Sequence, residues 1–153
     1  VKKGPMETIL QKATELGVNR IIPILSERTE VKELNLDRAK KIVIEATEQS
    51  NQLFPPEISK VTHLKDYLHN LDGSTKLLFA DVNSKNNLKK EILKEANFFS
   101  VLIGPEGDFS PNERELINSK SNTYSFSLSK NILRTDTAVI SAISLVKFVL
   151  NEH

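Results

Sequence analysis

The chain has 153 residues, of which 39% are hydrophobic and 27% are charged, a composition that is typical of one soluble globular domain. Its 21 basic and 20 acidic side chains leave a net charge of +1, which excludes a polycation that holds nucleic acid by overall attraction. The absence of cysteine excludes disulfides, thiolate nucleophiles and cysteine-based zinc sites, and the three histidines have no metal-ligand spacing, so no metal is expected.

The chain begins Val1-Lys2-Lys3-Gly4, without an initiator methionine and without an apolar leader. We therefore expect a cytoplasmic protein rather than a secreted one, and an upstream segment outside this chain. The lack of cysteine is compatible with a reducing compartment.

The first half of the chain predicts two helices on either side of one strand. Apolar residues recur at helical spacing from Pro5 to Gly17, and this glycine is a natural helix stop. Residues 20–25 form a short apolar run typical of a buried strand, which Pro23 places at a sheet edge or a strand end. A second helix is predicted over residues 35–52.

The second half alternates short apolar runs with helical patterns. Strands are predicted at residues 77–81, 98–103 and 123–126, and helices around residues 88–96, after the capping box Ser110-Pro111-Asn112-Glu113, and over residues 135–150. The strands are apolar on both faces, so we predict an α/β domain with a mostly parallel sheet and helices on both faces.

The final predicted helix is apolar almost all round, which indicates burial inside the domain or at a subunit interface, and we expect both. Its length of about 16 residues and the charge of Lys147 argue against a membrane span.

Gly104 and Gly107 follow the predicted strand at residues 98–103. Ligands of open α/β sheets bind beyond the carboxyl ends of the strands, and glycine there permits close backbone approach or a positive φ. The run matches neither a Walker A loop nor a dinucleotide-binding fingerprint. It is either a ligand loop or a plain tight turn.

The segment before the final helix is a second candidate site. Arg134 lies just before Thr135, Asp136 and Thr137, a cluster able to cap that helix. A helix N-terminus beside an arginine suits an anionic or electron-rich group. The alternative is a solvated capping loop with Arg134 in a surface ion pair.

Five motifs, in this order, resemble the catalytic domain of the bacterial 16S ribosomal RNA uridine N3-methyltransferases, which belong to the SPOUT superfamily. The resemblance covers residues 7 to about 150. The motifs are residues 7–18, then Pro23 with Ser26-Glu27-Arg28, Glu48-Gln49-Ser50 with Pro56-Glu57-Ile58, Leu102-Ile103-Gly104-Pro105-Glu106-Gly107, and residues 132–138.

The resemblance implies that residues 1–153 form one SPOUT α/β catalytic domain with a trefoil knot near the C-terminus, without the PUA-like RNA-binding domain that precedes it in the family. It implies S-adenosylmethionine as cofactor and a homodimer formed through the C-terminal helix. The implied reaction is methylation of N3 of uridine 1498 in 16S ribosomal RNA of the small ribosomal subunit, with no metal and no membrane involved.

The resemblance also implies the site residues. The cofactor would be held by Phe79, Ala80, Gly104, Pro105, Glu106, Gly107, Leu128, Ile132, Leu133, Thr135 and Ala138. The RNA or the partner subunit would be faced by Arg28, Glu48, Gln49 and Ser50. For catalysis, we expect Arg134 to stabilise negative charge on the uracil, with Glu106 as the candidate general base.

The chain departs from the family pattern at three positions. Asp108 stands where the family usually has glycine, and we expect the turn to form because aspartate accepts left-handed backbone better than most residues. Gln52 stands where an arginine is usual, which puts a contact to phosphate or base in question. Asp136 replaces a glutamate and still suits a helix start.

Two alternatives stay open. One is a SPOUT methyltransferase that acts on a ribose 2′-oxygen or on transfer RNA, although the Gly-Pro-Glu-Gly and Ile-Leu-Arg-Thr runs favour the uridine N3 group. The other is a dimeric module that binds cofactor or RNA without catalysis, which Asp108 and Gln52 keep open.

Overall fold

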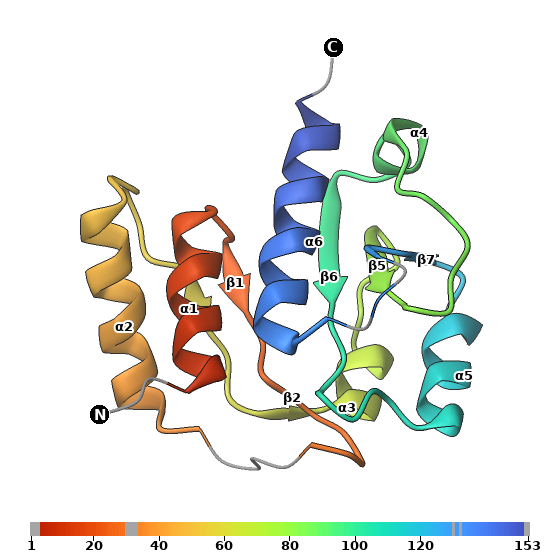
Figure 1. Ribbon diagram of the computed structural model, residues 1–153, viewed down its shortest axis with the longest axis horizontal. Helices are drawn as coiled ribbons and strands as arrows, with labels where there is room; N and C mark the ends of the chain where they lie inside the picture. Colours follow the sequence, from red (N-terminus) through yellow and green to blue (C-terminus); the bar gives the residue numbers. More distant parts are fainter. Residues whose placement is uncertain (1–3, 30–33, 130, 132, 152–153) are drawn as a thin grey trace.

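A computed structural model of the chain describes residues 4–29, 34–129, 131 and 133–151. Two helices, α1 (Pro5–Glu15) and α2 (Leu36–Gln49), pack against each other at one side (Figure 1). The last helix, α6 (Thr135–Leu150), packs on α1 and lies between these helices and a three-stranded sheet. Every described strand pair is parallel, so the predicted α/β class with parallel strands is confirmed.

The described strands form three small sheets instead of the single sheet that the sequence pattern predicts. In the three-stranded sheet, β5 (Thr75–Ala80) lies between β6 (Phe98–Leu102) and β7 (Thr123–Phe126). The two-stranded sheets pair β1 (Arg20–Ile21) with β3 (Glu57–Ile58), and β2 (Ile24–Leu25) with β4 (Thr62–His63).

The predicted strand over residues 20–25 is wrong in its continuity. It is interrupted at Ile22 and Pro23, and the two pieces belong to different sheets. Proline has no N–H to give to a strand ladder, and Pro23 takes part only as an acceptor here, from the Thr62 N–H at 2.9 Å.

Short elements account for the other differences. The stretch from His63 to Gly73, for which the sequence pattern predicts no element, contains α3 (Leu64–His69). A six-residue helix is too short for a helical period to stand out in the sequence. The predicted helix around residues 88–96 is shorter in the structure, where only the single turn of α4 (Lys90–Leu93) is helical.

Helix α5 (Pro111–Ser119) begins where the capping box predicts. Ser110 Oγ accepts from the Glu113 N–H at 3.3 Å, and Glu113 Oε1 accepts from the Ser110 N–H at 3.0 Å. Proline at the first helical position removes only an N–H that a helix start leaves unpaired. The start of α5 is therefore fixed directly after the loop that follows β6.

The predicted bounds of α6 are confirmed, but the predicted cap is wrong. Residues 135–137 form the first turn, and the residue before it, Arg134, is the N-cap and makes no side-chain capping bond. The helix buries Ala142, Ile143, Val146 and Val149, while the Phe148 ring is 70% exposed. No helix in the described part of the chain has both the length and the apolar content that a membrane crossing requires.

The two faces of the three-stranded sheet are covered by different helices, as predicted. Side chains alternate along β5, so Leu77 and Phe79 face α3 and α5, whereas Leu78 faces α4 and α6. Each face carries its own buried cluster.

Candidate functional site

The carboxyl ends of β5, β6 and β7 meet at one edge of the sheet. Phe79 is paired with Leu102, and Ala80 with Phe126, so the loops after all three strands leave from the same edge. Ala80, Ile103 and Leu128 pack against the same buried cluster as α6. The structure therefore brings the strand end at Ala80, the glycine loop and the start of the segment before α6 together, as the sequence predicts for a ligand site.

The glycine loop, residues 104–109, is shaped by close packing at Gly104. A Cβ added at Gly104 would lie 3.2 Å from Asp108 Oδ1 and 3.3 Å from the Phe109 ring. Neither Gly104 nor Gly107 has a positive φ, so the positive-φ alternative for these glycines is wrong. Asp108 takes the left-handed conformation instead, at φ 62°, which confirms that the turn forms without a glycine at this position.

Alanine at the two glycines is expected to have different effects. Gly104→Ala should lower the free energy of unfolding by about 1–2 kcal/mol, because the added methyl group overpacks against the buried Phe109 ring. Gly107→Ala should change it by less than about 0.5 kcal/mol, since a Cβ there makes an ordinary 3.5 Å contact with Arg28. Urea unfolding of the two variants measures the difference, and equal effects would contradict this account.

Arg114 joins two of the strand-end segments. Its Nη1 donates to Asp108 Oδ2 at 2.6 Å, and its Nη2 donates to Asp81 Oδ1. Asp81 directly follows β5 and is only 7% exposed. Sequence reasoning missed Arg114. The only hint in the sequence is Asp108, a carboxylate where the family usually has glycine, six positions before Arg114.

Arg28 also reaches the glycine loop. Its Nη1 donates to the Gly107 carbonyl at 3.0 Å, and the neighbouring Glu27 N–H donates to Glu113 Oε2 at 3.1 Å. The turn at residues 26–29 is thereby held against both the loop and the start of α5. Glu106 is exposed on the same loop. Arg28, predicted to face RNA or a partner, thus lies beside predicted cofactor residues.

Arg134 lies in a surface ion pair, the alternative that the sequence left open. Its side chain is 70% exposed, and its Nε lies 3.3 Å from Asp136 Oδ1. Leu133, Thr135 and Ala138 are half-buried around it. Ile132, another predicted cofactor contact, lies outside the described residues.

Phe79, expected to contact the cofactor, lies in the core and not in the wall of a site. Its side chain is 1% exposed and packs in the core against Phe109, with ring centroids 5.8 Å apart. A ligand at this edge can therefore meet Phe79 only through the backbone, whereas the half-buried Ala80 and Pro105 are accessible in part.

Glu48, Gln49 and Ser50 lie at the end of α2, away from the glycine loop. Just after these residues, Gln52 Nε2 donates to the Glu15 carbonyl at 3.4 Å. Gly17 lies close to both Gln52 Nε2 and Lys147 Nζ, so this end of α2 is near Lys147 of α6. Lys147 is near the C-terminus of α6, about 18 Å along the helix from Thr135 at 1.5 Å per residue. One chain therefore does not bring residues 48–50 to Arg134.

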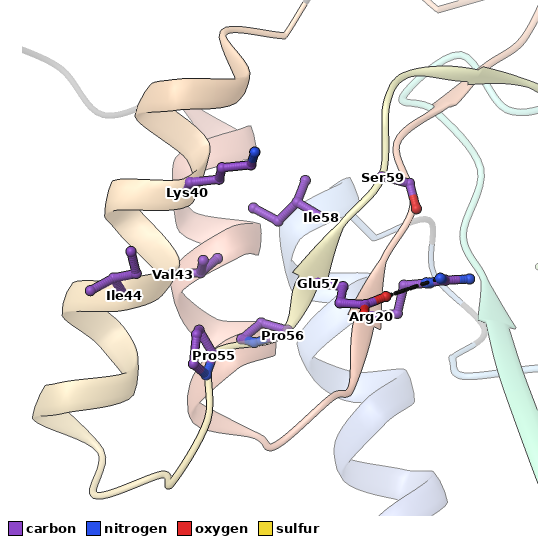
Figure 2. A pocket seen from close by; sticks show the side chains of 9 residues that line it. All are labelled: Arg20, Lys40, Val43, Ile44, Pro55, Pro56, Glu57, Ile58 and Ser59. Carbon is purple, nitrogen blue, oxygen red and sulfur yellow. Dashed lines mark hydrogen bonds and ion pairs between the residues drawn. The ribbon is translucent and has the colours of Figure 1, made fainter.

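A cavity of about 450 Å³ lies between α2 and the segment around β3 (Figure 2). Arg20 in its wall is already paired with Glu57 at 2.9 Å, and none of the predicted site residues lines it. The cavity could bind a ligand by contact with its walls, but it does not bring together the residues predicted to carry out a reaction. Its lining residues are Arg20, Lys40, Val43, Ile44, Pro55, Pro56, Glu57, Ile58 and Ser59.

Comparison with known proteins identifies clear relatives. A family described as RNA methyltransferase domain matches residues 1–147. The chain is 37% identical to the ribosomal RNA small subunit methyltransferase E of Rickettsia conorii and 38% identical to that of Aquifex aeolicus, with 100% and 92% of the chain covered. It spans 63% and 62% of the lengths of these relatives, less than two thirds in both cases.

A solved structure is similar over nearly the whole chain. It is the ribosomal RNA small subunit methyltransferase E of Neisseria gonorrhoeae bound to S-adenosyl methionine. The two are 30% identical with a TM-score of 0.88, and the similarity covers 97% of this chain and 63% of that one.

Proposed function

Since the chain belongs to the family of RNA methyltransferase domains, we propose that it catalyses methyl transfer from S-adenosylmethionine to N3 of uridine 1498 in 16S ribosomal RNA. The observation that carries the proposal is the shared carboxyl edge of β5, β6 and β7 in a chain whose close structural relative binds this cofactor. A ribosomal substrate would place the protein in the cytoplasm.

The residues at this edge fit the cofactor. Half-buried Ala80, Leu128, Leu133 and Ala138 offer an apolar surface for an adenine ring. The loop at residues 104–107 adds backbone donors and acceptors without bulky side chains at its two glycines. When bound there, the cofactor would supply a methyl group on a sulfonium centre, and in-line attack on that methyl carbon breaks the C–S bond and releases the sulfur as a neutral thioether.

Arg134 and the start of α6 supply the positive charge that the acceptor needs. Uridine N3 loses its proton before or during the attack on the methyl carbon, and the negative charge that this loss leaves on the uracil disappears as the N–CH₃ bond forms. Arg134 is solvent-exposed beside the helix N-terminus, so both the guanidinium and the helix dipole stabilise that charge. Glu106, exposed on the glycine loop, is the candidate acceptor of the proton.

We further propose a homodimer that packs through α6 and, from the family resemblance, a trefoil knot near the C-terminus. Phe148 and Leu150 support this contact, because they are large apolar side chains of α6 that are exposed in the single chain. Residues 48–50 lie at the far end of α6 from Arg134 of the same chain, so two antiparallel copies of α6 would bring them to the other copy's site.

Two measurements test the proposed reaction. Calorimetry should detect S-adenosylmethionine binding, and small ribosomal subunits that lack the modification should gain a methyl group that maps to uridine N3. The absence of cofactor binding, or cofactor binding without methyl transfer, would favour the non-catalytic module. Methyl groups that map to a ribose oxygen or to transfer RNA would favour the other SPOUT activity.

A further inference from the structure

The guanidinium of Arg114 forms a bridge, not a pair. Each of its two terminal nitrogens donates to a different carboxylate, Nη1 to Asp108 and Nη2 to Asp81. The Arg114 side chain is 16% exposed and that of Asp81 is 7% exposed, so the bond between them is largely shielded from water and from salt, whereas the Asp108 side chain is 43% exposed and solvent reaches its bond to Arg114 in part. Shielded bonds between charged groups are stronger and more directional than surface ion pairs.

The two carboxylates belong to different walls of the proposed cofactor site. Asp81 is tied to the strand ends, because its N–H donates to the Phe126 carbonyl at 2.9 Å and its Oδ1 accepts from the Asn83 N–H at 2.9 Å. Asp108 belongs to the glycine loop, and its Oδ1 accepts from the Phe109 N–H at 2.8 Å. The Arg114 bridge therefore holds the glycine loop at a set distance from the end of β5.

The bridge itself rests on a rigid support. Arg114 lies in the first turns of α5, whose start is fixed by the capping box and by the buried Phe109. Asp108 holds a left-handed backbone that aspartate adopts less readily than glycine, and Asp81 is a buried carboxylate that needs a charged partner. Arg114 satisfies both requirements at once.

We propose that Arg114 is a positioning residue for S-adenosylmethionine: it holds residues 104–108 in the cofactor-binding conformation. The inference rests on the proposed function. Without the bridge, the loop must be ordered when the cofactor binds, so affinity falls while the chemical step on bound cofactor is unchanged.

Arg114→Met tests the bridge, because methionine keeps the length and the apolar stem and removes the charge. We expect Kd and KM for S-adenosylmethionine to rise about tenfold, the usual effect of losing hydrogen bonds between charged groups, with kcat at saturating cofactor within about twofold. Arg114→Lys should give Kd and KM values between those of the wild-type chain and Arg114→Met, because a lysine ammonium keeps the charge but lacks the two terminal nitrogens with which the planar guanidinium reaches both carboxylates. Arg20→Met, which removes an exposed arginine paired with Glu57, is the control and should change nothing.

Hydrogen exchange of the 104–109 amides without cofactor gives a second readout and should be faster in Arg114→Met. If that variant does not fold, Asp108→Asn keeps the Arg114–Asp81 bond and should weaken cofactor binding about threefold. A folded Arg114→Met chain with wild-type affinity for S-adenosylmethionine would overturn the positioning role of Arg114 and leave the proposed function standing. Failure of the wild-type chain to bind the cofactor would instead overturn the proposed function and this role with it.

Discussion

Arg134→Ala is expected to lower kcat for RNA methylation by about 10²–10³-fold, the usual effect of removing a group that stabilises charge in the transition state. The affinity for S-adenosylmethionine should stay within about twofold, because this residue is proposed to act on the uracil. The measurement is single-turnover methylation of undermethylated small subunits at saturating cofactor.

The structure predicts that this variant folds normally. Arg134 is 70% exposed, it makes no side-chain capping bond, and its bonds to Asp136 are long, at 3.3 and 3.4 Å. A surface ion pair of this kind contributes at most about 1 kcal/mol to stability. A fall in kcat would therefore report on chemistry and not on folding.

Arg38→Ala is the matched control for Arg134. Arg38 also holds a surface ion pair next to a helix start, with Glu7 at 2.9 Å, but it lies on α2. Its loss should leave kcat unchanged. An Arg134→Ala protein that folds, binds cofactor and methylates at the wild-type rate would remove Arg134 from the mechanism.

The sequence predicts best those elements whose signals are local. The capping box places the start of α5, and ten apolar residues among the sixteen of α6 place that helix. The two-residue strands β3 and β4 escape prediction, and β1 and β2 are merged into one predicted strand, because their pairing depends on residues about 37 positions apart, as with Arg20 and Glu57. No periodicity can develop over two residues.

The same distinction applies to the site. Gly104 and Gly107 stand out as glycines after a buried strand, and the structure places them at the expected sheet edge. The Arg114 bridge does not stand out, because Asp81, Asp108 and Arg114 meet only when β5 and α5 have packed on the same face of the sheet. For Phe79, a local pattern would have corrected the expectation of a cofactor contact. Side chains alternate along β5, so Phe79 lies on the same face as Leu77 and is buried in the core with it.

Phe109→Ala should have the largest effect on stability, a loss of about 3–5 kcal/mol in the free energy of unfolding. The ring is 1% exposed and packs in the cluster that Phe79 and Ile117 share under α5. Its removal leaves a cavity at the point where the glycine loop joins the core. For a domain of marginal stability, that loss is a large part of the total. Urea unfolding followed by circular dichroism measures it.

Phe98→Ala is the control that separates burial from residue type. Phe98 begins β6 in the same sheet, but its ring is 64% exposed, so its loss should cost less than about 1 kcal/mol. Phe109→Leu should retain most of the stability, because it keeps most of the buried apolar volume. If Phe109→Ala and Phe98→Ala cost the same, the junction between loop and core would not depend on packing. The Arg114 bridge would then have no fixed support from which to hold the loop.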